Sequence, residues 1–180
     1  MATRILSVIG RKNAGKTTLT VALARELTHR GHRVMTIKHG HHPADADRAG
    51  SDSWRHFNLG RAERTLLASP ETRVLFERAP DEYDPEALAQ RYMQGADIVL
   101  CEGYKRAALP KIEVFRSAAA AHPIFDPAAP NAGEWIALVV DNVDTDNPAI
   151  RAARCAVLRF QDTSWLTTLT NVAWERAERL

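Results

Sequence analysis

The segment Arg4–Thr18, with the sequence RILSVIGRKNAGKTT, constrains the fold of this chain more than any other. A short apolar run ends at Gly10, and Gly15, Lys16 and Thr17 complete the spacing GxxxxGK[ST]. This is the P-loop pattern in the setting that it requires, after a predicted strand and before a predicted helix. It predicts a loop whose backbone N–H groups, together with the N-terminus of the next helix, face a phosphate chain.

The residue types in this loop suit a nucleoside triphosphate. The two glycines allow the backbone to curl around phosphate groups. Lys16 is expected to reach the β- and γ-phosphates and the Thr17 hydroxyl to ligate Mg²⁺. The sequence therefore predicts nucleotide binding, and the rest of the chain bears on what the nucleotide is used for.

The segments after the loop alternate between helical and extended patterns. Apolar residues recur at helical spacing from Leu19 to Leu27, and residues 33–38 follow as a buried strand, which makes a βαβ unit and a parallel sheet. Further helices are predicted at residues 53–59, from Asp84 and from about Ser164. Further strands are predicted at residues 64–68, 73–77, 97–101, 111–116, 135–140 and 156–160. The strand at 111–116 is expected to be half-exposed, because polar and apolar residues alternate in it. We expect one α/β domain over residues 1–180, a three-layer P-loop NTPase fold with a mostly parallel twisted sheet flanked by helices.

Charge and cysteine content narrow the class of protein. The 180 residues include 24 basic and 22 acidic side chains, a net charge of +2 without a basic block, so no nucleic-acid partner is predicted. Two cysteines make no disulfide framework, and we expect both to be reduced in a cytoplasmic protein. No apolar run approaches the ~20 residues of a membrane span, so no membrane association is predicted.

An acidic residue is predicted beside the loop. Glu102 directly follows the apolar strand DIVLC, at the strand end where open α/β sheets place ligands. We expect Glu102 to hold Mg²⁺ or to orient water, whereas Asp97, at the start of that strand, is interpreted as a surface or capping carboxylate. Asp52 has two interpretations, a further Mg²⁺ ligand or the N-cap of the helix near Ser53.

Three histidines, His39, His41 and His42, follow the second strand at the same sheet edge. They suit a transition-metal site, contacts to a phosphate or a pterin-like ring, or a solvated loop, and the residues alone leave these readings open.

No NKxD guanine signature is present, but Asp141 follows a late strand where a base-reading loop would lie. Its carboxylate can accept hydrogen bonds from N1–H and N2–H₂ of guanine, and ordinary turn chemistry is the alternative interpretation. Four cations are predicted near the ligand edge, either facing an anionic substrate or partner or lying on a solvated surface: Lys105, Arg106, Lys111 and Arg116.

Together these segments resemble the molybdopterin-guanine dinucleotide biosynthesis protein B (MobB) family. The matching blocks are VIGRKNAGKTTL, TIKHGHH, GSDSWRHFNLG, DIVLCEGYK and PKIEVFR, in family order over residues 5–116. The resemblance implies a weakly hydrolysing GTP-binding protein that assists attachment of GMP to molybdopterin, with GTP and Mg²⁺ as cofactors. It also implies a homodimer with an extended sheet, and a partner molybdopterin guanylyltransferase that performs the attachment.

The resemblance also assigns residues. Phosphate contacts come from the loop, namely Gly10, Arg11, Lys12, Asn13, Ala14, Gly15, Lys16, Thr17 and Thr18. Mg²⁺ is held by Thr17, Glu102 and Asp52, catalysis involves Lys16 and Glu102, and the loop from His39 to His42 lines the same cleft with His56. Two alternatives remain on the same fold: a small-molecule kinase with Glu102 as its base, and a nickel-type metallochaperone GTPase.

Overall fold

The structure, a computed structural model, describes residues 2–40, 46–79 and 84–180. The contacts of the chain define two compact units, Met1–His39 with Asp84–Leu180, and Gly40–Tyr83. The first unit contains the P-loop and the main sheet, and the second contains one helix and a hairpin. The expectation of one domain over residues 1–180 stays a prediction.

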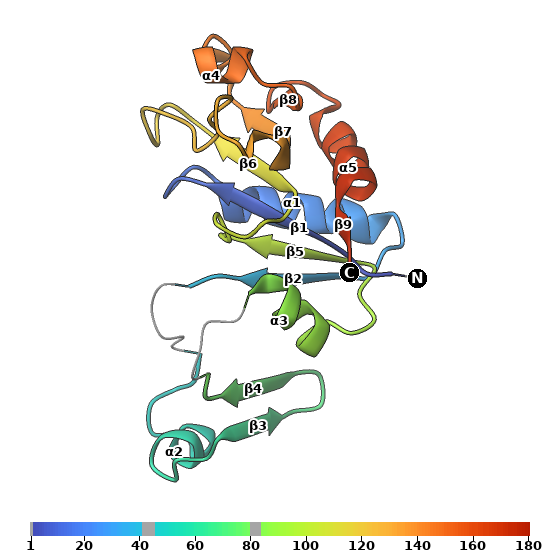
Figure 1. The fold of residues 1–180 in the computed structure, drawn as a ribbon. Helices are drawn as coiled ribbons and strands as arrows, with labels where there is room; N and C mark the ends of the chain where they lie inside the picture. Colours follow the sequence, from blue (N-terminus) through green and yellow to red (C-terminus); the bar gives the residue numbers. More distant parts are fainter. Residues whose placement is uncertain (1, 41–45, 80–83) are drawn as a thin grey trace. The chain divides into compact units, whose positions relative to one another are not determined.

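The main sheet has seven strands in the order β2-β5-β1-β6-β7-β8, with β9 pairing β1 (Figure 1). Their bounds are β1 (Arg4–Gly10), β2 (Val34–Lys38), β5 (Ile98–Glu102), β6 (Lys111–Phe115), β7 (Trp135–Val140), β8 (Ala156–Arg159) and β9 (Glu178–Arg179). All pairs are parallel except β1 with β9. The P-loop strand β1 therefore ends between the carboxyl ends of β5 and β6, where open parallel sheets bind ligands.

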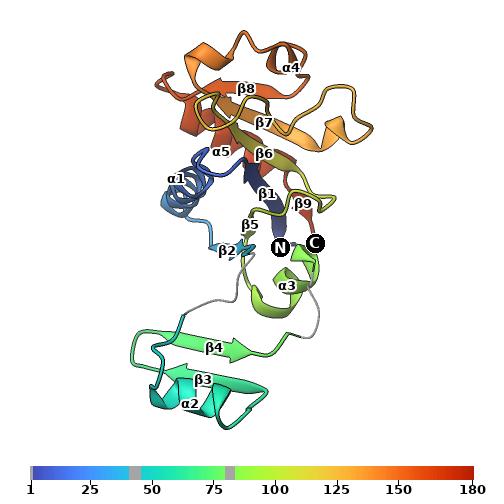
Figure 2. The ribbon, with the colours of Figure 1, turned by 90° about the vertical axis from the view of Figure 1, so that its left-hand side faces the viewer.

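Helices cover both faces of this sheet, as predicted. The described part of the first unit contains the α-helices α1 (Lys16–His29), α3 (Pro85–Tyr92), α4 (Pro148–Arg151) and α5 (Trp165–Arg176). Of these, α1 and α3 lie on opposite sides of the sheet (Figure 2). Leu6 of β1 packs in one core cluster with α1 and α5, and its neighbour Ile5 packs in another with α3, because successive strand residues point to opposite faces. None of the helices in the described part of the chain is long and apolar enough to cross a membrane.

The expectation that residues 111–116 form a half-exposed strand is wrong. Every residue of β6 is buried, because β6 lies between β1 and β7 and both of its faces are covered. The carboxylate of Glu113 accepts hydrogen bonds from the N–H groups of Ile124 (2.6 Å) and Phe125 (2.8 Å) and from the Trp135 indole (2.8 Å). Glu113 therefore ties the segment before β7 to the centre of the sheet.

Lys111, at the amino end of β6, is also fully buried. Its ammonium group donates to the Leu109 carbonyl at 3.2 Å, pairs with the Glu134 carboxylate and lies 5.5 Å from the ring centroid of Trp135. Its expected place at the ligand edge is wrong, since the ligand edge is at the opposite, carboxyl end of the strand. Lys111 has a structural role.

The sequence predicts a buried strand after α1, but this strand, β2, is only partly buried. Ile37 is its one buried residue, because β2 is the last strand of the sheet and pairs only with β5 among the described strands. An edge strand has one open side and fewer neighbours to cover its side chains.

The second unit contains the predicted helix, α2 (Asp52–Asn58), and the predicted hairpin of β3 (Arg64–Ala68) and β4 (Arg73–Glu77). The N-cap of α2 is Ser51, whose hydroxyl accepts a hydrogen bond from the Trp54 N–H at 3.2 Å. The interpretation of Asp52 as the N-cap is therefore wrong. Asp52 is the first residue of the helix, with a side chain 92% exposed and 3.9 Å from Arg55.

Candidate functional site

The P-loop connects the end of β1 to the start of α1, and its backbone shape depends on two glycines. Gly15 is the N-cap of α1 with φ 102° and ψ 20°, in the left-handed region that glycine favours. A Cβ at Gly10 would lie 2.6 Å from the Val114 carbonyl oxygen, so only glycine fits there. No side chain of the described residues caps α1, and its first turn has no acidic residue, which suits an N-terminus facing an anion.

The remaining loop residues surround this turn. Ala14 is buried in the core beneath the loop and fixes it to the sheet. Asn13 adopts a positive φ of 61°. Five residues of the loop and the first turn of α1 are exposed, namely Arg11, Lys12, Asn13, Thr17 and Thr18.

Lys16 lies among charged groups at this edge. Its Nζ donates to the Arg11 carbonyl at 2.9 Å. Burial lowers the pKa of Lys16 most, the positive charges of Lys105 and Lys38 lower it further, and the negative charge of Glu102 opposes them. A polyanion at this position would offset the repulsion of Lys16 by Lys105 and Lys38.

Thr17 and Glu102 face each other across the gap between α1 and β5. The Thr17 hydroxyl donates to Glu102 Oε1 at 2.8 Å, and Lys38 Nζ lies 3.8 Å from the same oxygen. Glu102 is 7% exposed and lies at the end of β5, where the sequence predicts it. The sequence places Lys38 at the end of the second strand, and its closeness to Glu102 follows from the register of β2 and β5, in which the two residues are partners.

The residues at this point suit Mg²⁺. A hydroxyl and a carboxylate oxygen are hard ligands, and Mg²⁺ is commonly held by one or two protein oxygens with substrate phosphates and water. Thr17 and Glu102 supply two such oxygens 2.8 Å apart. Asp52 belongs to the other compact unit and stays a predicted ligand. Within residues 2–40, 46–79 and 84–180 there is no group of three or more His, Cys, Asp and Glu side chains suited to a metal ion.

Of the three clustered histidines, the structure describes His39. Its backbone N–H donates to the Glu102 carbonyl at 2.9 Å, and its ring centroid lies 5.0 Å from that of Tyr104. His39 is therefore at the predicted edge, beside Glu102. His41 and His42 lie outside the described residues, and His56 is on α2 in the other unit, so their roles stay predictions.

Asp141 lies beyond β7, and the structure pairs it with Arg116. The Asp141 Oδ2 atom is 3.5 Å from Arg116 Nε. The sequence places each residue separately at this edge, and their pairing follows from the register of β6 and β7, in which Phe115 is opposite Val140. The role of Asp141 as a guanine reader stays a prediction.

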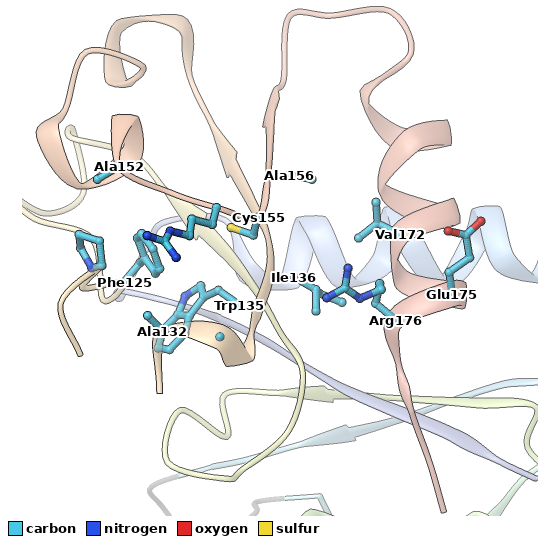
Figure 3. A pocket seen from close by; sticks show the side chains of 13 residues that line it. Phe125, Ala132, Trp135, Ile136, Ala152, Cys155, Ala156, Val172, Glu175 and Arg176 are labelled. Atoms are coloured by element: carbon cyan, nitrogen blue, oxygen red, sulfur yellow. The ribbon is translucent and has the colours of Figure 1, made fainter. Parts of the chain in front are cut away.

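A cavity of about 740 Å³ lies elsewhere, at the amino ends of β7 and β8 and the last turns of α5 (Figure 3). Trp135 and Cys155 line it, and Arg176 extends toward Ile136. Burial raises the pKa of the Cys155 thiol, which makes it a poor nucleophile. None of the predicted site residues that the structure describes lines this cavity, so it is separate from the P-loop edge.

The parallel order of strands, the helices on both faces and the glycine-rich turn between β1 and α1 define an α/β fold of the P-loop type. Within that class, the chain belongs to the family described as molybdopterin guanine dinucleotide synthesis protein B (MobB), whose sequence profile matches residues 5–141.

Two curated relatives, one from Haemophilus influenzae and one from Escherichia coli, are both called molybdopterin-guanine dinucleotide biosynthesis adapter protein. The first is 37% identical over 113 residues, 62% of this chain and 63% of the relative. The second is 37% identical over 122 residues, 66% of this chain and 69% of the relative. The chain thus matches slightly less than two thirds of the length of the Haemophilus protein.

Solved structures confirm the predicted fold over almost the whole chain. A MobB homologue from Bacillus stearothermophilus has a TM-score of 0.63 and 22% identity, covering 96% of this chain and 99% of that one. Bacillus subtilis MobB has a TM-score of 0.67 and 18% identity, covering 97% of this chain and 98% of that one. The resemblance includes the part after residue 141, beyond the family profile.

Proposed function

We propose that this protein is a GTP-binding adapter with slow GTPase activity that assists biosynthesis of molybdopterin guanine dinucleotide. The main observation in support of this proposal is the 2.8 Å hydrogen bond from the Thr17 hydroxyl to Glu102, close to Lys16 at the carboxyl edge of the sheet. Family membership and the names of the two curated relatives support the pathway.

The charges at this edge favour a triphosphate. The positive charges of Lys105 and Lys38 both act on Lys16, and the N-terminus of α1, which no described side chain caps, adds the positive end of a helix dipole. A nucleoside triphosphate brings the negative charge that offsets this group of cations. In the proposal its phosphates lie along Gly10–Thr18.

The chemistry of the site follows from its residues. Lys16 offsets the charge that develops on the γ-phosphate during hydrolysis, and Glu102 orients the attacking water. Thr17 and Glu102 would hold Mg²⁺, which would supply further neutralisation of the phosphate charge. Hydrolysis is slow in this proposal, because an adapter must hold GTP until its partner enzyme is engaged.

The proposed partners are a molybdopterin guanylyltransferase and a second copy of this chain. The hairpin of the second unit supports the homodimer, because Leu66, Leu67 and Leu75 are 60%, 44% and 45% exposed. A two-stranded hairpin is marginally stable alone and gains from burying such residues. Sedimentation of the wild type should give a dimer and of Leu66→Asp a monomer, while a dimer in both would remove the hairpin from the interface.

The function is tested in a reconstituted reaction of molybdopterin, Mg·GTP and a purified guanylyltransferase. Wild-type protein should increase attachment of GMP to molybdopterin, and Lys16→Ala should abolish both GTP binding and this stimulation. Arg25→Ala, which removes an exposed cation on the far part of α1, is the matched control. Undiminished stimulation by a Lys16→Ala protein that no longer binds GTP would refute the proposal.

A further inference from the structure

Arg116, the residue after β6, lies beside three parts of the first unit. Its Nε lies 3.5 Å from Asp141 Oδ2, and its guanidinium carbon lies 4.7 Å from the ring centroid of Phe160. The same carbon is 4.0 Å from the position that a Cβ on Gly15 would occupy. The side chain therefore connects the P-loop with the ends of β7 and β8.

The backbone on either side of this contact is fixed. The N–H of Ser117 donates to both carboxylate oxygens of the buried Asp144 at 3.2 Å, which ties the end of β6 to the turn after β7. The N–H of Phe160 donates to the Val140 carbonyl at 3.0 Å, which ties the end of β8 to β7. Arg116, Asp141 and Phe160 are thus presented by three neighbouring strand ends.

The polar groups of this contact are incompletely paired. The Nε atom of Arg116 is buried and has no hydrogen-bond partner among the described residues. Its 3.5 Å separation from Asp141 is an ion pair but is long for a hydrogen bond. The guanidinium carbon lies over the ring of Phe160, and the side chain of Arg116 is 39% exposed. A planar ligand at this edge has both an exposed flat cation and a carboxylate to contact.

We propose that Arg116 is a specificity-determining residue that selects a guanine base by positioning Asp141. This inference rests on the proposed GTP binding. Arg116 engages Oδ2 of Asp141 and leaves the other oxygen for the base, while its exposed face supports the purine ring. Guanine offers N1–H and N2–H₂ donors to that oxygen, whereas adenine presents the lone pair of N1 and no 2-amino group.

The position of the guanidinium over Phe160 makes the choice of arginine specific. A guanidinium is planar and extends over several atoms, so it can lie over Phe160 and keep its Nε 3.5 Å from Asp141, whereas an ammonium group cannot do both. Replacement by lysine keeps the charge beside the P-loop but loses this arrangement. Arg116→Lys should therefore retain attraction for phosphate and lose selectivity for the base.

The test is the ratio of the Kd values for Mg·ATP and Mg·GTP, measured by calorimetry. Wild type should prefer GTP, and Arg116→Ala and Arg116→Lys should each reduce the ratio by about tenfold or more. Arg159→Ala is the matched control, since Arg159 is an exposed arginine near the same edge that pairs with Asp162 at 3.0 Å. It should leave the ratio unchanged.

A double variant distinguishes a role of Arg116 in positioning Asp141 from general damage to the fold. If Arg116 acts through Asp141, adding Arg116→Ala to Asp141→Ala should cause no further loss of the ratio. Melting temperatures without nucleotide show whether each variant is folded. A ratio in both Arg116 variants within about twofold of wild type would overturn the inference while GTP binding stands. No GTP binding by wild type would instead overturn the proposed function itself.

Discussion

Thr17 and Glu102 are 85 residues apart in the sequence, yet the Thr17 hydroxyl donates a 2.8 Å hydrogen bond to Glu102 Oε1. The contact joins the first turn of α1 to the carboxyl end of β5. It places the two oxygens that we propose as Mg²⁺ ligands side by side, close to Lys16.

Thr17→Val should weaken binding of Mg·GTP by about tenfold or more, because valine keeps the shape of threonine and removes the hydroxyl. Thr17→Ser should bind nearly as well as wild type. Calorimetric titrations with Mg²⁺ and with EDTA measure the effect, and the difference between the variants should disappear in EDTA. Equal affinities of wild type and Thr17→Val in Mg²⁺ would exclude the hydroxyl as a ligand.

The affinity for GTP should fall with rising pH, starting below the ordinary lysine pKa of 10.5, because burial lowers the pKa of Lys16. The phosphates favour the protonated amine, so binding takes up a proton. Affinity is therefore complete below the pKa of Lys16 in the free protein and is lost as pH rises through it.

Lys16→Arg is the control for this pH dependence, since arginine stays charged throughout the range. The measurement is the ratio of GTP affinities of wild type and Lys16→Arg from about pH 7 to about pH 10, in which titration of the nucleotide itself cancels. A constant ratio would show that Lys16 does not titrate with binding.

Gly10→Ala should destabilise the protein by about 1–3 kcal/mol and disturb the loop, because its Cβ would lie 2.6 Å from the Val114 carbonyl oxygen. Gly133→Ala is the matched control, as nothing lies within 4 Å of a Cβ at Gly133. Its free energy of unfolding should change by less than about 0.5 kcal/mol. Urea unfolding measures both, and equal stabilities would contradict the packing at Gly10.

Glu113→Gln should reduce the free energy of unfolding by about 2–3 kcal/mol. The three N–H donors that face the buried carboxylate would meet an amide that has only one acceptor oxygen. Glu175→Gln, at an exposed position on α5, is the control and should change stability little. A Glu113→Gln protein as stable as wild type would show that these hydrogen bonds contribute nothing net.

The sequence predicts elements whose signals are local. The strand at 135–140 and the hairpin strands at 64–68 and 73–77 match their predicted bounds, because each is bounded by turn residues or polar segments. The burial of β6 was not predicted, because the Glu134 partner of Lys111 and the N–H donors to Glu113 lie beyond β6 in the chain. An alternating pattern indicates exposure only where no such partners exist.

In the candidate site, too, the sequence predicts the residues whose signals are local and not the others. The P-loop and Glu102 could be placed from a motif and a strand end, since both depend on neighbouring residues in the chain. The Arg116–Asp141 pair depends on the register of two parallel strands, which spacing alone does not reveal. Asp52, His41 and His42 stay predictions, and so does the identity of the bound nucleotide.

The most direct test of the central claim is calorimetric titration of Mg·GTP into wild type, Lys16→Ala and Arg25→Ala. Wild type and Arg25→Ala should bind GTP with one site per chain, and Lys16→Ala should show no binding at the same concentrations. GTP binding by Lys16→Ala as tight as that of wild type would contradict the account, as would an absence of binding by the wild-type protein.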